Sequence, residues 1–160
     1  MKKNYMKLLF FTIAMLFVQN TMAQCPADED FTQICSAAGG FSFNLSTAGN
    51  TAPAGNDYDC LGTQPDPSFF YLIGDAAGTI NLELSSSDDV DYIIWGPFAD
   101  VSTGIGACGS YNAGQVADCS YAAGASNGGN EEQIDITGVN PGDVYVLMVT
   151  NFGSAPTAAL

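Results

Sequence analysis

The chain has 160 residues with 17 Asp or Glu, three Lys or Arg and no histidine, so its formal net charge is −14. The basic residues are Lys2, Lys3 and Lys7, and no side-chain cation follows them. Nucleic acid and anionic membrane surfaces are therefore not expected partners, because both are bound through Lys or Arg. The lack of histidine also excludes a Ser-His-Asp triad, a Cys-His pair and histidine metal ligands.

Residues 1–23 have the pattern of a secretory signal peptide. A basic start is followed by the apolar run Leu8–Val18 and by small residues up to Ala23. The run is short for a membrane span, although a retained anchor is the alternative. Cleavage before Gln24 leaves 137 residues (160 − 23) with 17 acidic and no basic side chains, a charge of −17. We therefore expect one domain, residues 24–160, that is secreted or displayed on the cell surface.

The first half of this domain predicts strands by its apolar periodicity. Residues 41–46 and 79–85 alternate between apolar and polar side chains, which is typical of half-buried strands. Residues 68–73 are apolar on both faces, which is typical of a central strand covered on both sides. The segment Asp75–Gly78 is predicted to turn between the strands at 68–74 and 79–85.

The second half continues in the same way. Residues 90–95 and 144–149 are apolar on both faces, whereas 133–138 is a shorter strand. Asn140–Asp143 has Pro then Gly at its centre, which predicts a type II turn that joins 133–138 and 143–151 as a hairpin. Residues 102–130 are rich in Gly, Ala, Ser and Asn and predict a long loop.

Together these segments predict an all-β fold, an antiparallel β-sandwich of the jelly-roll kind tied by disulfides. The 18 Gly and seven Pro argue against long helices. The final segment, "GSAPTAAL", comes where a sandwich usually has a closing strand, which leaves open that the 160 residues are the front of a longer protein.

All five cysteines follow residue 23, and an exported chain meets an oxidising environment. We predict the bridges Cys25–Cys35 and Cys108–Cys119, each closing a loop of about ten residues and contributing roughly 2–4 kcal/mol. Cys60 is then the spare thiol. The other pairings stay open, because spacing alone does not fix connectivity. A structural metal site is the rival interpretation, but the cysteines lack the close pairs that such sites use.

Several acidic residues are two apart. Asp89 and Asp91 share one face of a strand, and Asp88 lies in the preceding loop. Oxygen ligands in this number suit calcium, so Ca²⁺ is the candidate cofactor. The alternative is that the acids prevent strand-edge pairing and keep the surface soluble. The segment lacks the glycine and the spacing of an EF-hand loop. Further candidate ligands are Asp57, Asp59, Glu131 and Glu132.

The aromatic side chains are candidates for stacking on a sugar ring. Tyr111 and Tyr121 lie in the predicted loop and are the better candidates, whereas Trp95 ends an apolar strand, which favours the core. Tyr58 and Tyr92 are further candidates. Catalysis is not expected: a glycosidase needs two acids that flank a cleft, and nothing singles out one acidic pair here.

The order of motifs resembles a known family. It runs "NDYDCLGTQPDPSFFYLI", "GTINLELSSSDDVDYIIWGPF", "ACG" with "VADCSYAAG", and "EEQIDITGVNPGDVYVLMVTNFG", over roughly residues 25–152. This is similar to the N-terminal sandwich domains of secreted, gliding-motility-associated and type-nine-secreted Bacteroidetes surface proteins, and more distantly to bacterial pre-peptidase C-terminal domains. The resemblance implies a non-catalytic module on an exported, often adhesive, protein. Members usually carry a C-terminal sorting domain, which this sequence lacks.

The sequence thus predicts a secreted or surface-displayed bacterial module that binds or adheres without catalysis, with calcium as a candidate stabilising ion. Its partner, a surface glycan or a protein, is not identified by the sequence. The alternative is a carbohydrate-binding module of an exported polysaccharide-active protein, with Trp95, Tyr111 and Tyr121 as ligand-binding residues.

Overall fold

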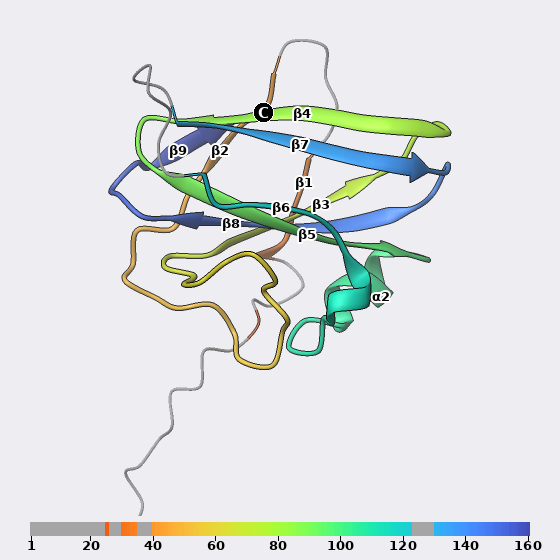
Figure 1. The fold of residues 1–160 in the computed structure, drawn as a ribbon, viewed down its shortest axis with the longest axis horizontal. Helices are drawn as coiled ribbons and strands as arrows, with labels where there is room; N and C mark the ends of the chain where they lie inside the picture. The colour runs from red at the N-terminus through yellow and green to blue at the C-terminus, as the bar shows by residue number, and fades with distance from the viewer. Residues whose placement is uncertain (1–24, 26–29, 35–39, 123–129) are drawn as a thin grey trace, which may run out of the picture.

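The computed structural model describes residues 25, 30–34, 40–122 and 130–160, and these form two β-sheets packed face to face (Figure 1). The strands are β1 (Thr32–Gln33), β2 (Ser42–Asn44), β3 (Ser68–Ile73), β4 (Gly78–Ser86), β5 (Val90–Phe98), β6 (Val116–Ser120), β7 (Asn130–Val139), β8 (Val144–Asn151) and β9 (Thr157–Ala159). One sheet has the order β1-β3-β8-β5-β6 and the other β2-β9-β4-β7. Every pairing is antiparallel except β1 with β3. The predicted all-β sandwich is therefore confirmed, whereas the predicted signal peptide lies outside the described residues.

The five-stranded sheet is apolar on both faces. All eight residues of β8 are buried, as expected for a strand paired with β3 and β5. On β8, Leu147 and Val149 join the core between the sheets, whereas Val146 and Met148 join a second core on the other face. We call this second cluster the outer core. It is covered by the long segment between β2 and β3 and by the helix α2 (Val101–Gly106) (Figure 1).

The two predicted turns connect the sheets to each other. The turn at Asn140–Asp143 joins β7 of the four-stranded sheet to β8 of the five-stranded sheet, so the predicted hairpin is wrong. β8 does not pair with β7 because β3 and β5 already pair with its two edges. Both faces of β8 are also covered. The turn after β3 also crosses between the sheets. Two backbone hydrogen bonds join these turns: Gly74 N–H donates to Asp143 O and Gly142 N–H donates to Gly74 O, each at 2.8 Å.

Residues 102–130 are more regular than the predicted loop. They contain most of α2, the 3₁₀ turn η2 (Ala113–Gln115) and the edge strand β6, while 123–129 lie outside the described residues. Capping explains the two short helices, because the Asp100 carboxylate accepts from Thr103 N–H at 2.7 Å and the Asn112 side chain accepts from Gly114 N–H at 3.1 Å. Capping residues such as Asp and Asn are also typical of loops, so composition alone predicts a loop in this region.

The disulfides differ from the predicted pairing. The structure joins Cys25 to Cys108 and Cys60 to Cys119, across 83 and 59 positions of sequence. The predicted bridges Cys25–Cys35 and Cys108–Cys119 are wrong, because Cys25 and Cys108 are bonded to each other and Cys119, in β6, is bonded to Cys60. Cys60, the predicted spare thiol, instead ties the covering segment to the edge of the five-stranded sheet. Cys35 lies outside the described residues.

Candidate functional site

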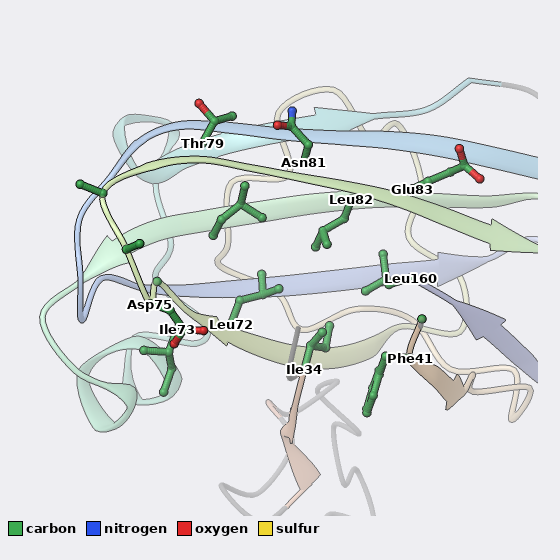
Figure 2. A pocket seen from close by; sticks show the side chains of 15 residues that line it. Ile34, Phe41, Leu72, Ile73, Asp75, Thr79, Asn81, Leu82, Glu83 and Leu160 are labelled. Carbon is green, nitrogen blue, oxygen red and sulfur yellow. The ribbon is translucent and has the colours of Figure 1, made fainter. Parts of the chain in front are cut away.

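A groove of about 560 Å³ opens between the two sheets beside β4 (Figure 2). Side chains from both sheets line it: Leu72 comes from β3, and Ile80 and Leu82 come from β4. Phe41 and Leu160 lie together at one part of its wall (Figure 2), where the two residues exchange backbone hydrogen bonds of 2.7 and 2.9 Å. The wall is therefore largely apolar, although it is open to water.

The groove lies where the pairing of β4 with β9 ends among the described residues. In the described part of the chain, β9 pairs with β4 only at Ser85 and Ser86, so residues 79–84 have no strand partner on that side. Leu84, close to this pairing, is fully buried, whereas the inward-facing Ile80 and Leu82 are only half-buried. The sheet thus lacks strand cover along most of the inner edge of β4.

Polar groups surround this apolar surface. Thr79, Asn81 and Glu83 point to the opposite side of β4 from Leu82 (Figure 2), as alternation along a strand requires. Asn81 donates to the carboxylate of Asp135 on β7. Asp75, in the turn after β3, adds a second carboxylate at one end of the groove (Figure 2). The groove therefore combines an apolar interior with negative side chains along its border.

In the first group of predicted calcium ligands, the Asp88 side chain and the Asp89 main chain accept hydrogen bonds from the backbone. Asp88 accepts from Ser154 N–H at 2.7 Å, and the Asp89 carbonyl accepts from Phe152 N–H at 2.9 Å, so both residues hold the segment that follows β8. Asp91 is 7% exposed and stands opposite Thr150 of β8. No group of three or more Cys, Asp or Glu within the described residues is placed to hold a metal ion.

The second group lies in the segment that covers the outer core. The Asp57 carboxylate accepts from Asp59 N–H at 2.9 Å, and Asp57 N–H donates to Tyr111 O at 2.7 Å. Both acids border a shallow hollow that Tyr58 also lines. Calcium binding stays a prediction from the sequence, and thermal unfolding with calcium and with a chelator would check it.

The chain after Lys7 has no basic side chains, and its carboxylates accept hydrogen bonds from backbone N–H groups and hydroxyl groups instead. Asp66 accepts from the N–H groups of Gly49 and Asn50 at 2.6 and 2.9 Å. Asp118 accepts from the Tyr92 hydroxyl and from Asp135 N–H, each at 2.7 Å. Bonds between a carboxylate and a neutral donor are charge-assisted, so they order loops and strand ends without an ion pair.

Folding raises the pKa of two acids, Asp91 and Glu132. Burial, followed by the charges of Asp89 and Glu132, raises the pKa of Asp91 from 3.8 to about 6. Burial also raises the pKa of Glu132, although hydrogen bonds from Ser120 and from Ala122 N–H oppose that shift. Raised pKa values often mark functional sites, but neither residue lines the groove or the shallow hollow.

These shifts predict greater stability in mild acid. A carboxyl group whose pKa is raised by folding adds stability that is full below its unfolded pKa and is lost as the pH rises through its folded pKa. The contribution of Asp91 to stability is therefore lost as the pH rises from about 4 to 6. One pKa unit corresponds to about 1.4 kcal/mol, so with partial contact to water we expect Asp91→Asn to stabilise the protein at pH 7 by about 1–2 kcal/mol.

Urea unfolding between pH 4 and 7 would measure this. The gain from Asp91→Asn over the wild type should shrink toward pH 4, where the wild-type carboxyl is protonated in the folded protein. Asp30→Asn, at an exposed position, is the matched control and should follow the wild type throughout. A gain from Asp91→Asn that does not change with pH would contradict the assignment to this carboxyl.

Two of the three predicted stacking residues are buried. Trp95 and Tyr111 are 0% and 1% exposed, and their rings stack on each other with centroids 4.5 Å apart in the outer core. Each is held by its polar end: the Trp95 indole N–H donates to Asp57 O at 3.0 Å and the Tyr111 hydroxyl donates to Gly104 O at 2.8 Å. In this structure neither ring is accessible to a sugar, so their placement in a ligand site is wrong. Tyr121, at 66% exposed, is accessible.

Sequence reasoning identified the inward face of β4 but missed the groove. The alternation in 79–85 correctly places Ile80, Leu82 and Leu84 toward the interior. The groove depends on how the two sheets are placed beside β4, and no local sequence pattern encodes that placement.

No helix in the part of the chain that the structure describes is long and apolar enough to cross a bilayer. No protein-family model and no curated protein matches the sequence. The structure is similar to the crystal structure of the pre-peptidase C-terminal domain of a collagenase from Bacillus anthracis, with a TM-score of 0.40 and 11% identity over 80% of this chain and 90% of that one. That domain belongs to the more distant of the two classes that the motifs resemble, and the likeness to Bacteroidetes surface proteins stays a prediction.

Proposed function

We propose that this chain is a non-catalytic binding module of an exported bacterial protein and that the groove beside β4 is its ligand-binding site. The observation that carries the proposal is the half-exposed state of Ile80 and Leu82, which face inward and have no strand beside them among the described residues. Open apolar surface bordered by polar groups is typical of sites that bind a partner.

Export and the absence of catalysis have separate support. The pattern of residues 1–23 is that of a signal peptide, and the two disulfides are typical of proteins that fold in an oxidising compartment. The chain after Lys7 has no histidine, lysine or arginine to act as a base or to position an anionic substrate. The groove has an aliphatic and aromatic interior, which suits binding. A role in adhesion at the cell surface is part of this proposal.

Arrays of immobilised ten-residue peptides and of glycans would test the proposal. We expect saturable binding to a subset of the peptides. Leu82→Asp should weaken it at least tenfold, because the substitution places a charge on the apolar interior of the groove. Thr137→Asp adds the same charge at an exposed position on β7, opposite Thr79, and should leave binding unchanged.

The alternative function is a carbohydrate-binding module, and the exposed ring of Tyr121 favours it. Saturable glycan binding that is lost in Tyr121→Ala and kept in Leu82→Asp would establish that alternative and overturn the groove. A lack of saturable binding on the peptide array would also contradict the proposal, because the groove would then have no peptide ligand.

A further inference from the structure

We propose that the shallow hollow beside Asp57 and Asp59 is a second binding site of this chain and that it binds the hydroxyl groups of a neutral saccharide. This site is separate from the groove beside β4. The hollow has a volume of about 590 Å³, within the range of roughly 300–1,000 Å³ that is usual for sites of small ligands. Its lining residues all fall in 55–64 and 111–112, inside the continuously described range 40–122.

Two segments that are far apart in the sequence form the hollow, and they are fixed to each other. The Asn56 side-chain oxygen accepts from Tyr111 N–H at 3.1 Å, and Asp57 N–H donates to Tyr111 O at 2.7 Å. The bridge between Cys60 and Cys119 ties the first of these segments to β6. The walls of the hollow are therefore held in place before a ligand arrives, which lowers the entropy cost of binding.

Carboxylates supply hydrogen-bond acceptors in the hollow. Asp57 and Asp59 are both exposed. One oxygen of the Asp57 carboxylate accepts from Asp59 N–H at 2.9 Å, which leaves the other oxygen for a ligand. The Asp59 carboxylate accepts no hydrogen bond from the described residues. Because an ionised carboxylate can accept several hydrogen bonds, each of these two can bind neighbouring hydroxyl groups of one ligand.

Side-chain amides supply donors in the same hollow. An amide NH₂ group has two N–H donors. Asn56 uses one of them on the Tyr58 hydroxyl oxygen at 3.2 Å. Gln64 uses one on Leu61 O at 2.7 Å, and Asn112 uses one within the cap of η2. Each of these three amides therefore keeps a second N–H group that no described residue accepts.

The combination of donors and acceptors indicates the class of ligand. A hydroxyl group both donates and accepts, so a saccharide matches the carboxylates and the amides together. An ammonium or guanidinium group has donors only and would leave the amide N–H groups without acceptors. The two carboxylates repel an anion. The half-buried ring of Tyr58 adds apolar surface for the C–H groups of a sugar ring.

An array of neutral oligosaccharides of glucose, mannose, galactose and xylose is the probe for the full 160-residue chain, with oligogalacturonate as the anionic counterpart. We expect saturable binding to at least one neutral oligosaccharide and at least tenfold weaker binding of oligogalacturonate. A chelator should leave the binding unchanged. Because the ligand has no charge, raising NaCl from about 0.05 to about 0.5 M should change the affinity less than twofold.

Asp59→Asn tests the carboxylate that has no described partner. Asn has a similar size and tolerates the left-handed backbone of this residue, whose φ is 42°. We expect the substitution to weaken saccharide binding at least tenfold, because hydrogen bonds to a charged acceptor are the stronger ones. Glu131→Gln, the matched control at an exposed position on β7, should bind as the wild type does. Leu82→Asp and Tyr121→Ala should also keep this binding.

Nuclear magnetic resonance of the ¹⁵N-labelled wild type makes the result independent of any variant. Titration with the oligosaccharide that binds on the array should shift the side-chain NH₂ signals of Asn56 and Gln64 and the backbone amides of residues 57–64. The amides of residues 79–84, beside the groove, should stay unchanged. Signals that shift only outside residues 55–64 and 111–112 would place the saccharide elsewhere and overturn the inference.

Other results would also overturn it. Saccharide binding that is lost in Tyr121→Ala would place the sugar at that ring, and binding that a chelator abolishes would make a metal ion part of the ligand. If no neutral oligosaccharide binds saturably, the hollow is not a saccharide site. Peptide binding in the groove is measured separately through Leu82→Asp, so the proposed function stands or fails by its own result.

Discussion

Replacing Trp95 with alanine should lower the free energy of unfolding by about 3–5 kcal/mol, the range found when a buried aromatic side chain is removed. The side chain is fully buried and contacts two tyrosines, stacking on Tyr111 and meeting Tyr58 edge-on with centroids 5.9 Å apart. Its indole N–H also fixes Asp57 O, so the substitution leaves both a cavity and an acceptor without its donor. Urea unfolding followed by far-ultraviolet circular dichroism measures the loss.

Two further variants make this result specific to burial. Trp95→Phe keeps an aromatic ring and should cost less than Trp95→Ala, because it leaves a smaller cavity. Tyr121→Ala removes an aromatic ring that is 66% exposed and should change stability by less than about 0.5 kcal/mol. If Trp95→Ala and Tyr121→Ala cost the same, Trp95 is not a core residue and a role in ligand stacking returns.

Cys60→Ser should destabilise the protein by about 4 kcal/mol. The bridge to Cys119 spans 59 positions, and the chain-entropy model assigns about this energy to a loop of that length. The pairing predicted from the sequence leaves Cys60 as a spare thiol, so it predicts almost no effect from the same substitution. Urea unfolding under oxidising conditions would therefore discriminate between the two connectivities in a single experiment.

Cys35→Ser is the matched comparison, because neither observed bridge includes Cys35. It should leave the Cys60–Cys119 bridge and its stabilisation intact. Peptide mapping of the oxidised protein should recover Cys60 joined to Cys119 and Cys25 joined to Cys108. Recovery of Cys108 joined to Cys119 would contradict the structure and support the shorter loops.

The sequence predicts the strands well because their signal is local. Alternation in residues 79–85 and the apolar run at 144–149 appear as β4 and β8, with inward and central positions as expected. The identity of a strand's neighbour is not local. The Asn140–Asp143 turn has hairpin residues, but it joins two sheets because β8 already has β3 and β5 beside it.

The candidate site was harder to predict because it depends on contacts between distant segments. The acidic pairs suggested a metal centre, whereas backbone N–H groups contact carboxylates such as those of Asp57 and Asp88. Tyr111 looked like a loop residue and is instead enclosed under the covering segment. The groove beside β4 is lined by residues from both sheets, such as Leu72 and Leu82, and periodicity within one strand does not encode that neighbourhood.

The covering of the outer core links folding to the redox state of the compartment. Cys60 holds the long segment that shields Trp95 and Met148, and its partner Cys119 lies on a different strand of the sheet. Under reducing conditions this disulfide cannot form, so the aromatic face of the five-stranded sheet is less well shielded and the domain is easier to unfold. Oxidation then fixes the covering segment over that face, so the stability of this domain depends on the redox state in which it folds.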